Sequence, residues 1–119
     1  MHMVMFVLDD PNQLDEILNA WEKVGISGAT IIESTGINRY KRAQLVGSAF
    51  MAGINRLMSA SEENHYTLFA IVNKDEMIED CLHAVESIVG DLSQPNTGIF
   101  FAWPLDFVKG VPGLNEMRS

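Results

Sequence analysis

One order of hydrophobic patterns occurs twice in this chain and constrains its fold more than any other feature. In the first half, an apolar run at residues 2–8 ends at the turn-forming sequence Asp9-Asp10-Pro11. Asp10 and Pro11 are typical of a helix start, an apolar stripe follows at helical spacing, and Gly25 is a typical helix stop. The β-branched residues 29–34 then predict a second strand, which completes a β-α-β unit.

The second half repeats this order. Residues 66–72 predict a strand, an apolar stripe between Asn73 and Gly90 predicts a helix, and residues 99–103 predict the last strand. Two successive β-α-β units indicate an α+β, ferredoxin-like βαββαβ fold, in which both helices lie on one face of an antiparallel four-stranded sheet. The strands are apolar enough that we expect other subunits to cover the second face.

Composition fits one domain spanning residues 1–119, with residues 105–119 as a C-terminal tail. The 119 residues are 47% hydrophobic, which supplies one core, and the formal net charge of -8 disfavours binding to nucleic acid. Cys81 is the single cysteine, so no internal disulfide forms. The N-terminus lacks signal-peptide zones, and no apolar run approaches the roughly 18 residues of a membrane span. We therefore expect a cytoplasmic protein.

A long insertion, residues 35–65, follows the second predicted strand. Connections of this length in a compact domain are often functional. Half of the Lys and Arg residues of the chain lie here: Arg39, Lys41, Arg42 and Arg56. Within it, residues 42–58 show interrupted helical periodicity. The segment could bind an anion or nucleotide through its cations, dock to a membrane protein or lipid surface, or simply be a solvated loop.

Several residues, taken in order, resemble the PII family of trimeric nitrogen-regulatory proteins. They are the sequence VGISGAT at residues 24–30, TGINR at residues 35–39, and Ile99-Phe100 followed by Pro104. The insertion at 35–65 falls where PII proteins have their T-loop. The resemblance implies a homotrimer that binds an effector in clefts between subunits. In the family this effector is an adenine nucleotide, sometimes with a small carboxylate or magnesium, and the T-loop then contacts a membrane transporter or an enzyme.

The resemblance also implies ligand-binding positions. Thr30 matches a nucleotide-contacting threonine, and the T-loop base and its cations are Gly36, Ile37, Asn38, Arg39, Lys41 and Arg42. The polar loop 91–98 would wrap the ligand with backbone donors and with Ser93, Asn96, Thr97 and Gly98. Gly98 stands where the family has a phosphate-binding lysine. Residues 105–113, where the family has two arginines, offer only Lys109. A triphosphate would therefore be poorly neutralised. We expect a small anionic effector, and an adenine nucleotide is one candidate.

Two other functions remain open from the sequence. One is a metal-responsive trimer similar to the CutA proteins, although His2, His65 and His83 have no metal-motif spacing. The other is a ferredoxin-like oligomeric enzyme of unidentified reaction, since this fold hosts many chemistries. We predict no catalytic residue and no metal ligand. Cys81 belongs to an apolar stripe and is expected in the core, and Asp9 and Asp10 are expected to cap a helix or face solvent.

Overall fold

The computed structural model describes residues 1–26, 28–37 and 65–111. The elements follow in the order β1 (His2–Leu8), the 3-10 turn η1 (Pro11–Gln13), α1 (Leu14–Val24), β2 (Ala29–Ser34), β3 (His65–Val72), α4 (Asp75–Val89) and β4 (Gly98–Pro104). The predicted βαββαβ order is therefore confirmed, with strand limits within one residue of those expected. Most of the insertion predicted at 35–65 lies outside the described residues.

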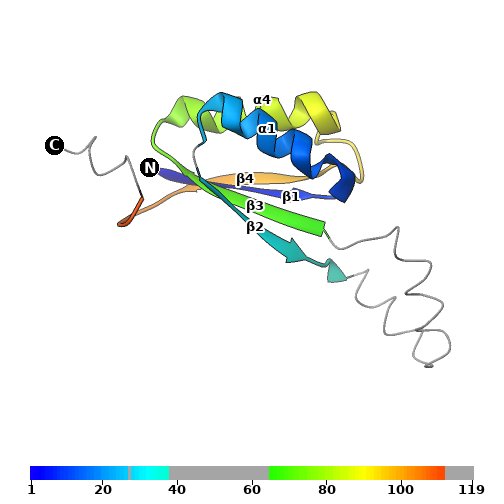
Figure 1. Cartoon of the computed structure of the whole chain (residues 1–119), viewed down its shortest axis with the longest axis horizontal. Coiled ribbons are helices and arrows are strands. Elements are labelled where there is room, and N and C mark those ends of the chain that lie inside the picture. The colour runs from blue at the N-terminus through cyan, green and yellow to red at the C-terminus, as the bar shows by residue number, and fades with distance from the viewer. Residues whose placement is uncertain (27, 38–64, 112–119) are drawn as a thin grey trace.

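The four strands form one antiparallel sheet in the order β2-β3-β1-β4. Both helices cover the same face of this sheet, and β2 and β4 form its edges (Figure 1). This arrangement confirms the predicted α+β, ferredoxin-like fold. No helix in the described ranges is long and apolar enough to cross a membrane.

Local sequence signals set where the helices begin and end. Asp10 accepts a hydrogen bond from the Asn12 N–H at 3.0 Å, although the first turn is 3-10 rather than α-helical. Gly25 ends α1 in the left-handed conformation, with φ 109°, as glycine does at many helix C-termini. Helix α4 begins at Asp75 with Lys74 as its N-cap residue. The turn η1 before α1 is also joined to α4, because the Gln13 side chain donates to the Ile88 carbonyl at 3.3 Å.

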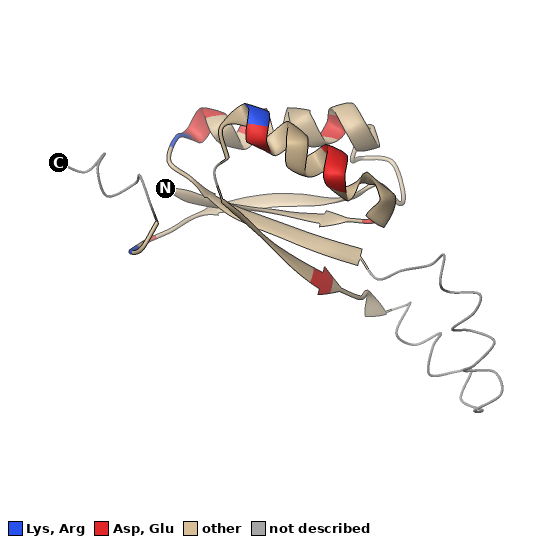
Figure 2. Cartoon of the chain, viewed as in Figure 1, with Lys and Arg blue, Asp and Glu red and all other residues tan. Residues whose placement is uncertain are grey.

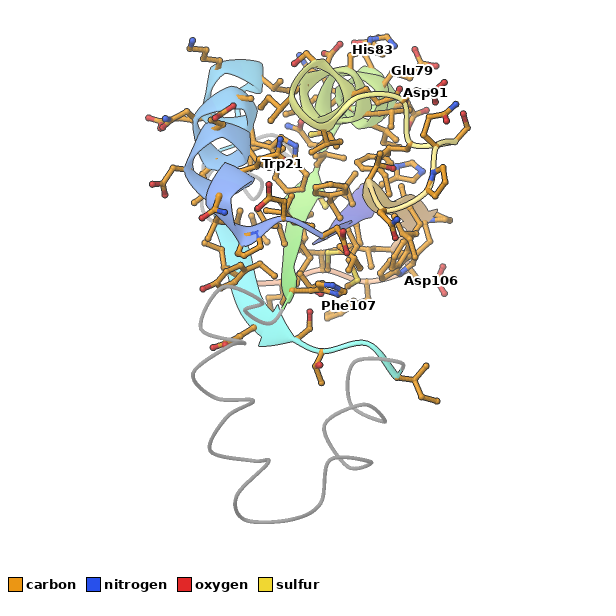
Figure 3. The ribbon with its side chains drawn as sticks, turned by 90° about the vertical axis from the view of Figure 1, so that its right-hand side faces the viewer. Trp21, Glu79, His83, Asp91, Asp106 and Phe107 are labelled. Carbon is orange, nitrogen blue, oxygen red and sulfur yellow. The ribbon has the colours of Figure 1, made fainter. Side chains whose placement is uncertain are left out.

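The core lies between the helices and the covered sheet face. Alternate residues of the two central strands are buried there, as expected for a sheet with one covered face. The buried hydrophobic residues are Val4, Phe6, Leu8, Ile17, Trp21, Ile26, Leu68, Ala70, Val72, Cys81 and Val85. Trp21 of α1 points into this layer (Figure 3) and is only 1% exposed. The core positions predicted for Trp21 and Cys81 are confirmed.

Neither of the described helices, α1 and α4, covers the second face of the sheet, which we call the open face (Figure 1). Apart from Ser34 and His65 at its end, the register places these side chains on it: Met3, Met5, Val7, Thr30, Ile32, Thr67, Phe69, Ile71, Ile99, Phe101 and Trp103. None of them is charged. Phe101 and Trp103 stack with ring centroids 5.7 Å apart and remain 40% and 38% exposed. The acidic side chains lie mainly on the two helices, at the opposite surface of the molecule (Figure 2).

Candidate functional site

The described parts of the two candidate ligand-binding segments lie at one end of the sheet. Leu8 pairs with Gly98 on one side and with Tyr66 on the other, and Tyr66 pairs with Glu33. Loop 91–98 therefore enters the β4 edge at the same end at which Gly36 and Ile37 leave the β2 edge. Strands are spaced about 4.8 Å apart, so three spacings separate the two edges by about 14 Å. A compact ligand such as a small carboxylate cannot contact both edges of the same copy.

On the β2 edge, Gly36 and Ile37 follow the last residue of the strand, and the Ile37 side chain is 69% exposed. Thr30 pairs with Phe69, so its side chain lies on the open face and is exposed. It stands four residues before Ser34, which places it about 13 Å along the strand from the Gly36 end. The structure therefore groups Gly36 with Ile37, whereas Thr30 lies near the other end of β2.

On the β4 edge, loop 91–98 is folded by hydrogen bonds within the chain. The Ser93 N–H donates to Asp91 Oδ1 at 2.9 Å, and the Thr97 hydroxyl donates to the Gln94 carbonyl at 2.9 Å. Asn96 has a positive φ of 63°, which asparagine tolerates better than most residues. Ser93 and Asn96 are exposed, and Thr97 is half-buried. The loop is thus a well-hydrogen-bonded turn that presents short polar side chains to solvent.

Gly98 has a packing role that the sequence does not reveal. Its φ is +128°, and a Cβ atom there would approach the Val7 carbonyl oxygen to 2.5 Å and the Phe6 ring to 2.8 Å. Glycine is therefore required where loop 91–98 joins β4, independently of any ligand. Beside it, an open hollow of about 370 Å³ is lined by Leu82, Glu86, Leu92, Gly98, Ile99 and Phe100.

A polar cluster at the same end of the sheet joins the ends of three strands. His65 Nε2 lies 2.9 Å from Asp9 Oδ1. The two residues meet because β1 and β3 are neighbouring antiparallel strands. The Ser34 hydroxyl donates to the His65 carbonyl at 3.2 Å and shares a hydrogen bond of 2.9 Å with the Thr67 hydroxyl. Gly36 lies against the His65 ring, since a Cβ on Gly36 would be 3.8 Å from its Cε1 atom.

This polar cluster corrects one expectation. Asp10 caps a helix as predicted, but Asp9 pairs with His65 instead of serving only as a cap or a solvated group. Sequence patterns could not reveal the pair, because the two residues are 56 positions apart and meet only through the β1–β3 register. The alternation of apolar residues in the two strands is the one signal that could have given this register.

The cationic side chains of the candidate site are not placed. Outside the described residues lie the cations Arg39, Lys41 and Arg42, together with the uncharged Asn38. Among residues 1–26, 28–37 and 65–111, no three His, Cys, Asp or Glu side chains lie close enough together to hold a metal ion. His2 Nδ1 lies 3.3 Å from Asp75 Oδ1, at the opposite end of β1 from the polar cluster. The described part of the site thus offers hydroxyls, amides and one His–Asp pair.

Neither a scan against protein-family models nor a search of curated proteins finds a match to this chain.

Proposed function

We propose that this chain is a PII-like regulatory protein of the cytoplasm. Three copies assemble, a small anionic effector binds in the clefts between them, and the 35–65 segment signals the bound state to a membrane transporter or a cytoplasmic enzyme. The fold supports this proposal, because a βαββαβ scaffold with a long insertion after its second strand is what the resemblance to PII proteins implies.

One observation carries the proposal. The two candidate ligand-binding edges lie at the same end of the sheet but about 14 Å apart within one copy. Loop 91–98 on the β4 edge of one copy can approach Gly36 and Ile37 on the β2 edge of the next. A cleft of this kind would bring Gly36 and Ile37 of one copy beside loop 91–98 of the next, and it does not exist in an isolated chain.

The open face supports assembly of several copies. Away from the polar cluster at its end, this face carries no charged side chain and leaves Phe101 and Trp103 exposed, and exposed apolar patches of this kind mark interaction surfaces. The acidic helices lie on the other side of the molecule (Figure 2), so copies that meet through the sheet keep their like charges apart. Aromatic residues are also enriched at subunit interfaces.

The roots of the 35–65 segment provide a connection between effector and output. Gly36 is the second residue of the segment and His65 is its last, and the two lie side by side in the polar cluster. An effector bound beside Gly36 would contact one root directly. For signalling, the effector must have different affinities for the two states of the segment.

A thermal-unfolding series on the full chain tests this function. We expect at least one compound from a panel of adenine nucleotides and small carboxylates to raise the melting temperature, since a ligand at 100 times its Kd stabilises a protein by about 2.7 kcal/mol. Mutation of Asn96→Gly removes the exposed amide of loop 91–98 and accepts the positive φ of 63°, so it should reduce the increase if this loop contacts the effector. Asn19→Ala, on the exposed surface of α1, is the control and should leave it unchanged.

A melting temperature that no member of the panel changes, with or without Mg²⁺, would contradict the proposal. An equal response in all variants would retain an effector but remove Asn96 from its site.

A further inference from the structure

Loop 91–98 has the length and polarity of a phosphate-binding turn, yet its first backbone donors are already used. The Leu92 N–H donates to Glu86 Oε2 at 3.0 Å, and the Ser93 N–H donates to Asp91 Oδ1 at 2.9 Å. The Gln94 N–H donates to the Asp91 carbonyl at 3.0 Å. Pro95 has no N–H at all. Three successive donors, which could otherwise bind an oxyanion, are therefore directed to acceptors of the same chain.

Two of these three acceptors are carboxylates. Hydrogen bonds from the backbone and the side chain of Ser93 hold the pKa of Asp91 below its ordinary value, so this group is ionised at neutral pH. Glu86 lines the hollow between α4 and the start of β4, where its neighbours Leu82, Leu92 and Phe100 are apolar. A phosphate at this loop would approach two negative charges and would have to displace them from their donors.

The cations that would offset this repulsion are absent from the described surroundings of the loop. Lys23 and Lys74 are attached to the other ends of the two helices, and Lys109 follows the far end of β4. Asp91 projects from the end of α4 towards solvent, on the acidic side of the molecule (Figures 2 and 3). The local field thus disfavours a polyanion.

We propose that Glu86 and Asp91 are specificity-determining residues that exclude phosphate chains from loop 91–98. The effector of the proposed cleft presents an uncharged group to this loop, and nucleoside di- and triphosphates are excluded. This inference rests on the proposed function only in assigning the loop to an effector site. The exclusion of phosphate itself follows from the hydrogen bonds of the loop.

Calorimetric titration of the full chain with inorganic pyrophosphate tests the exclusion directly. We expect no measurable binding by the wild-type protein at millimolar pyrophosphate. Asp91→Ala and Glu86→Ala each free one donor and remove one charge, so each should increase pyrophosphate affinity by about tenfold or more. Asp91→Asn keeps an oxygen acceptor for Ser93 and should give a smaller increase.

Asp106→Asn is the matched control, because it removes one exposed acidic charge beyond the far end of β4. It should behave like the wild-type protein. Circular dichroism identifies any variant that fails to fold, and Asp91→Asn tests the charge effect if either alanine variant does.

Two results would overturn the inference. One is tight, micromolar binding of pyrophosphate by the wild-type protein. The other is an increase in pyrophosphate affinity that is no greater in the Asp91 and Glu86 variants than in Asp106→Asn. Neither result affects the effector panel, in which small carboxylates are tested separately from adenine nucleotides. The reverse case is also distinguishable. If no compound of the panel changed the melting temperature but Asp91→Ala bound pyrophosphate clearly more tightly, the proposed function would be contradicted and the exclusion of phosphate would stand.

Discussion

Gly98 joins loop 91–98 to β4 in a conformation that other residues adopt only with strain. Mutation of Gly98→Ala should lower the free energy of unfolding by about 2–4 kcal/mol, because the new Cβ meets the Val7 carbonyl oxygen at 2.5 Å and φ is +128°. Gly28→Ala is the control, since its Cβ would meet no atom within 4 Å. Urea unfolding at one protein concentration measures both changes, and equal losses would contradict the packing role of Gly98.

Cys81 shows how burial controls reactivity. Burial raises the pKa of its thiol from 9.0 to about 11, with a smaller contribution from the charge of Asp80. Since the folded-state pKa is the higher one, the stabilisation is fully present below pH 9 and is lost as the pH rises through 11. We expect a thiol reagent at pH 8 to modify Cys81 slowly in the folded protein and rapidly in urea.

The pH dependence of stability isolates this thiol. The difference in unfolding free energy between the wild-type protein and Cys81→Ala should shrink between pH 9 and pH 11. A difference that stays constant over this range would show that the thiol ionises equally in both states.

At the scale of elements, the Asp9–His65 pair fastens the end of β1 to the start of β3. The His65 side chain is 19% exposed and that of Asp9 is 36% exposed, so solvent screens the interaction only in part. A double-mutant cycle with Asp9→Asn and His65→Gln should give a coupling of about 0.5–1 kcal/mol. The His2–Asp75 pair is the control, because its atoms are 3.3 Å apart and the Asp75 side chain is 87% exposed. We expect the less exposed Asp9–His65 pair to have the larger coupling energy, and equal coupling energies for the two pairs would contradict this expectation.

The elements themselves could be predicted from the sequence because each has a local signal. Periodicity marks the strands and helices, and residues such as Asp10 and Gly25 mark where α1 begins and ends. The fold class follows from their order. The start of α4 was less predictable, since Lys74 occupies the N-cap position although lysine is not a typical capping residue.

The site was less predictable because its contacts join distant parts of the chain. Asp9 and His65 meet through strand register, and the need for glycine at position 98 depends on Phe6 and Val7 of a neighbouring strand. The donors of loop 91–98 were expected to face a ligand, whereas the carboxylates of Glu86 and Asp91 accept two of them. Sequence patterns report the polarity of a loop but not the direction of its N–H groups.

At the scale of the whole molecule, charge and apolar surface are separated into layers. Acidic residues lie on the two helices (Figure 2). On the open face of the sheet, no acidic side chain occurs among the outward-facing residues from Met3 to Val7, from Thr67 to Ile71 and from Ile99 to Trp103. This layering favours assembly through the sheet and exposure of the acidic helices to solvent. The proposed effector clefts exist only in such an assembly.

Trp103 provides the sharpest way to disturb this assembly. Mutation of Trp103→Asp places a charge beside Phe101, on the open face, and should dissociate the oligomer while leaving the helix-side core unchanged. Phe107→Asp is the control, because Phe107 is 78% exposed and lies three residues after the end of β4. Sedimentation velocity compares the variants, and circular dichroism shows whether the fold is retained. Dissociation by Phe107→Asp alone would place the interface outside the open face.

Native mass spectrometry of the full chain, purified gently from cells, tests the central claim most directly. The proposed intersubunit effector site predicts a mass of three chains, with a retained small molecule that is lost when Trp103→Asp breaks the assembly. A protein that remains a single chain at micromolar concentration would contradict the account, because one copy cannot bring the β2 and β4 edges to the same ligand.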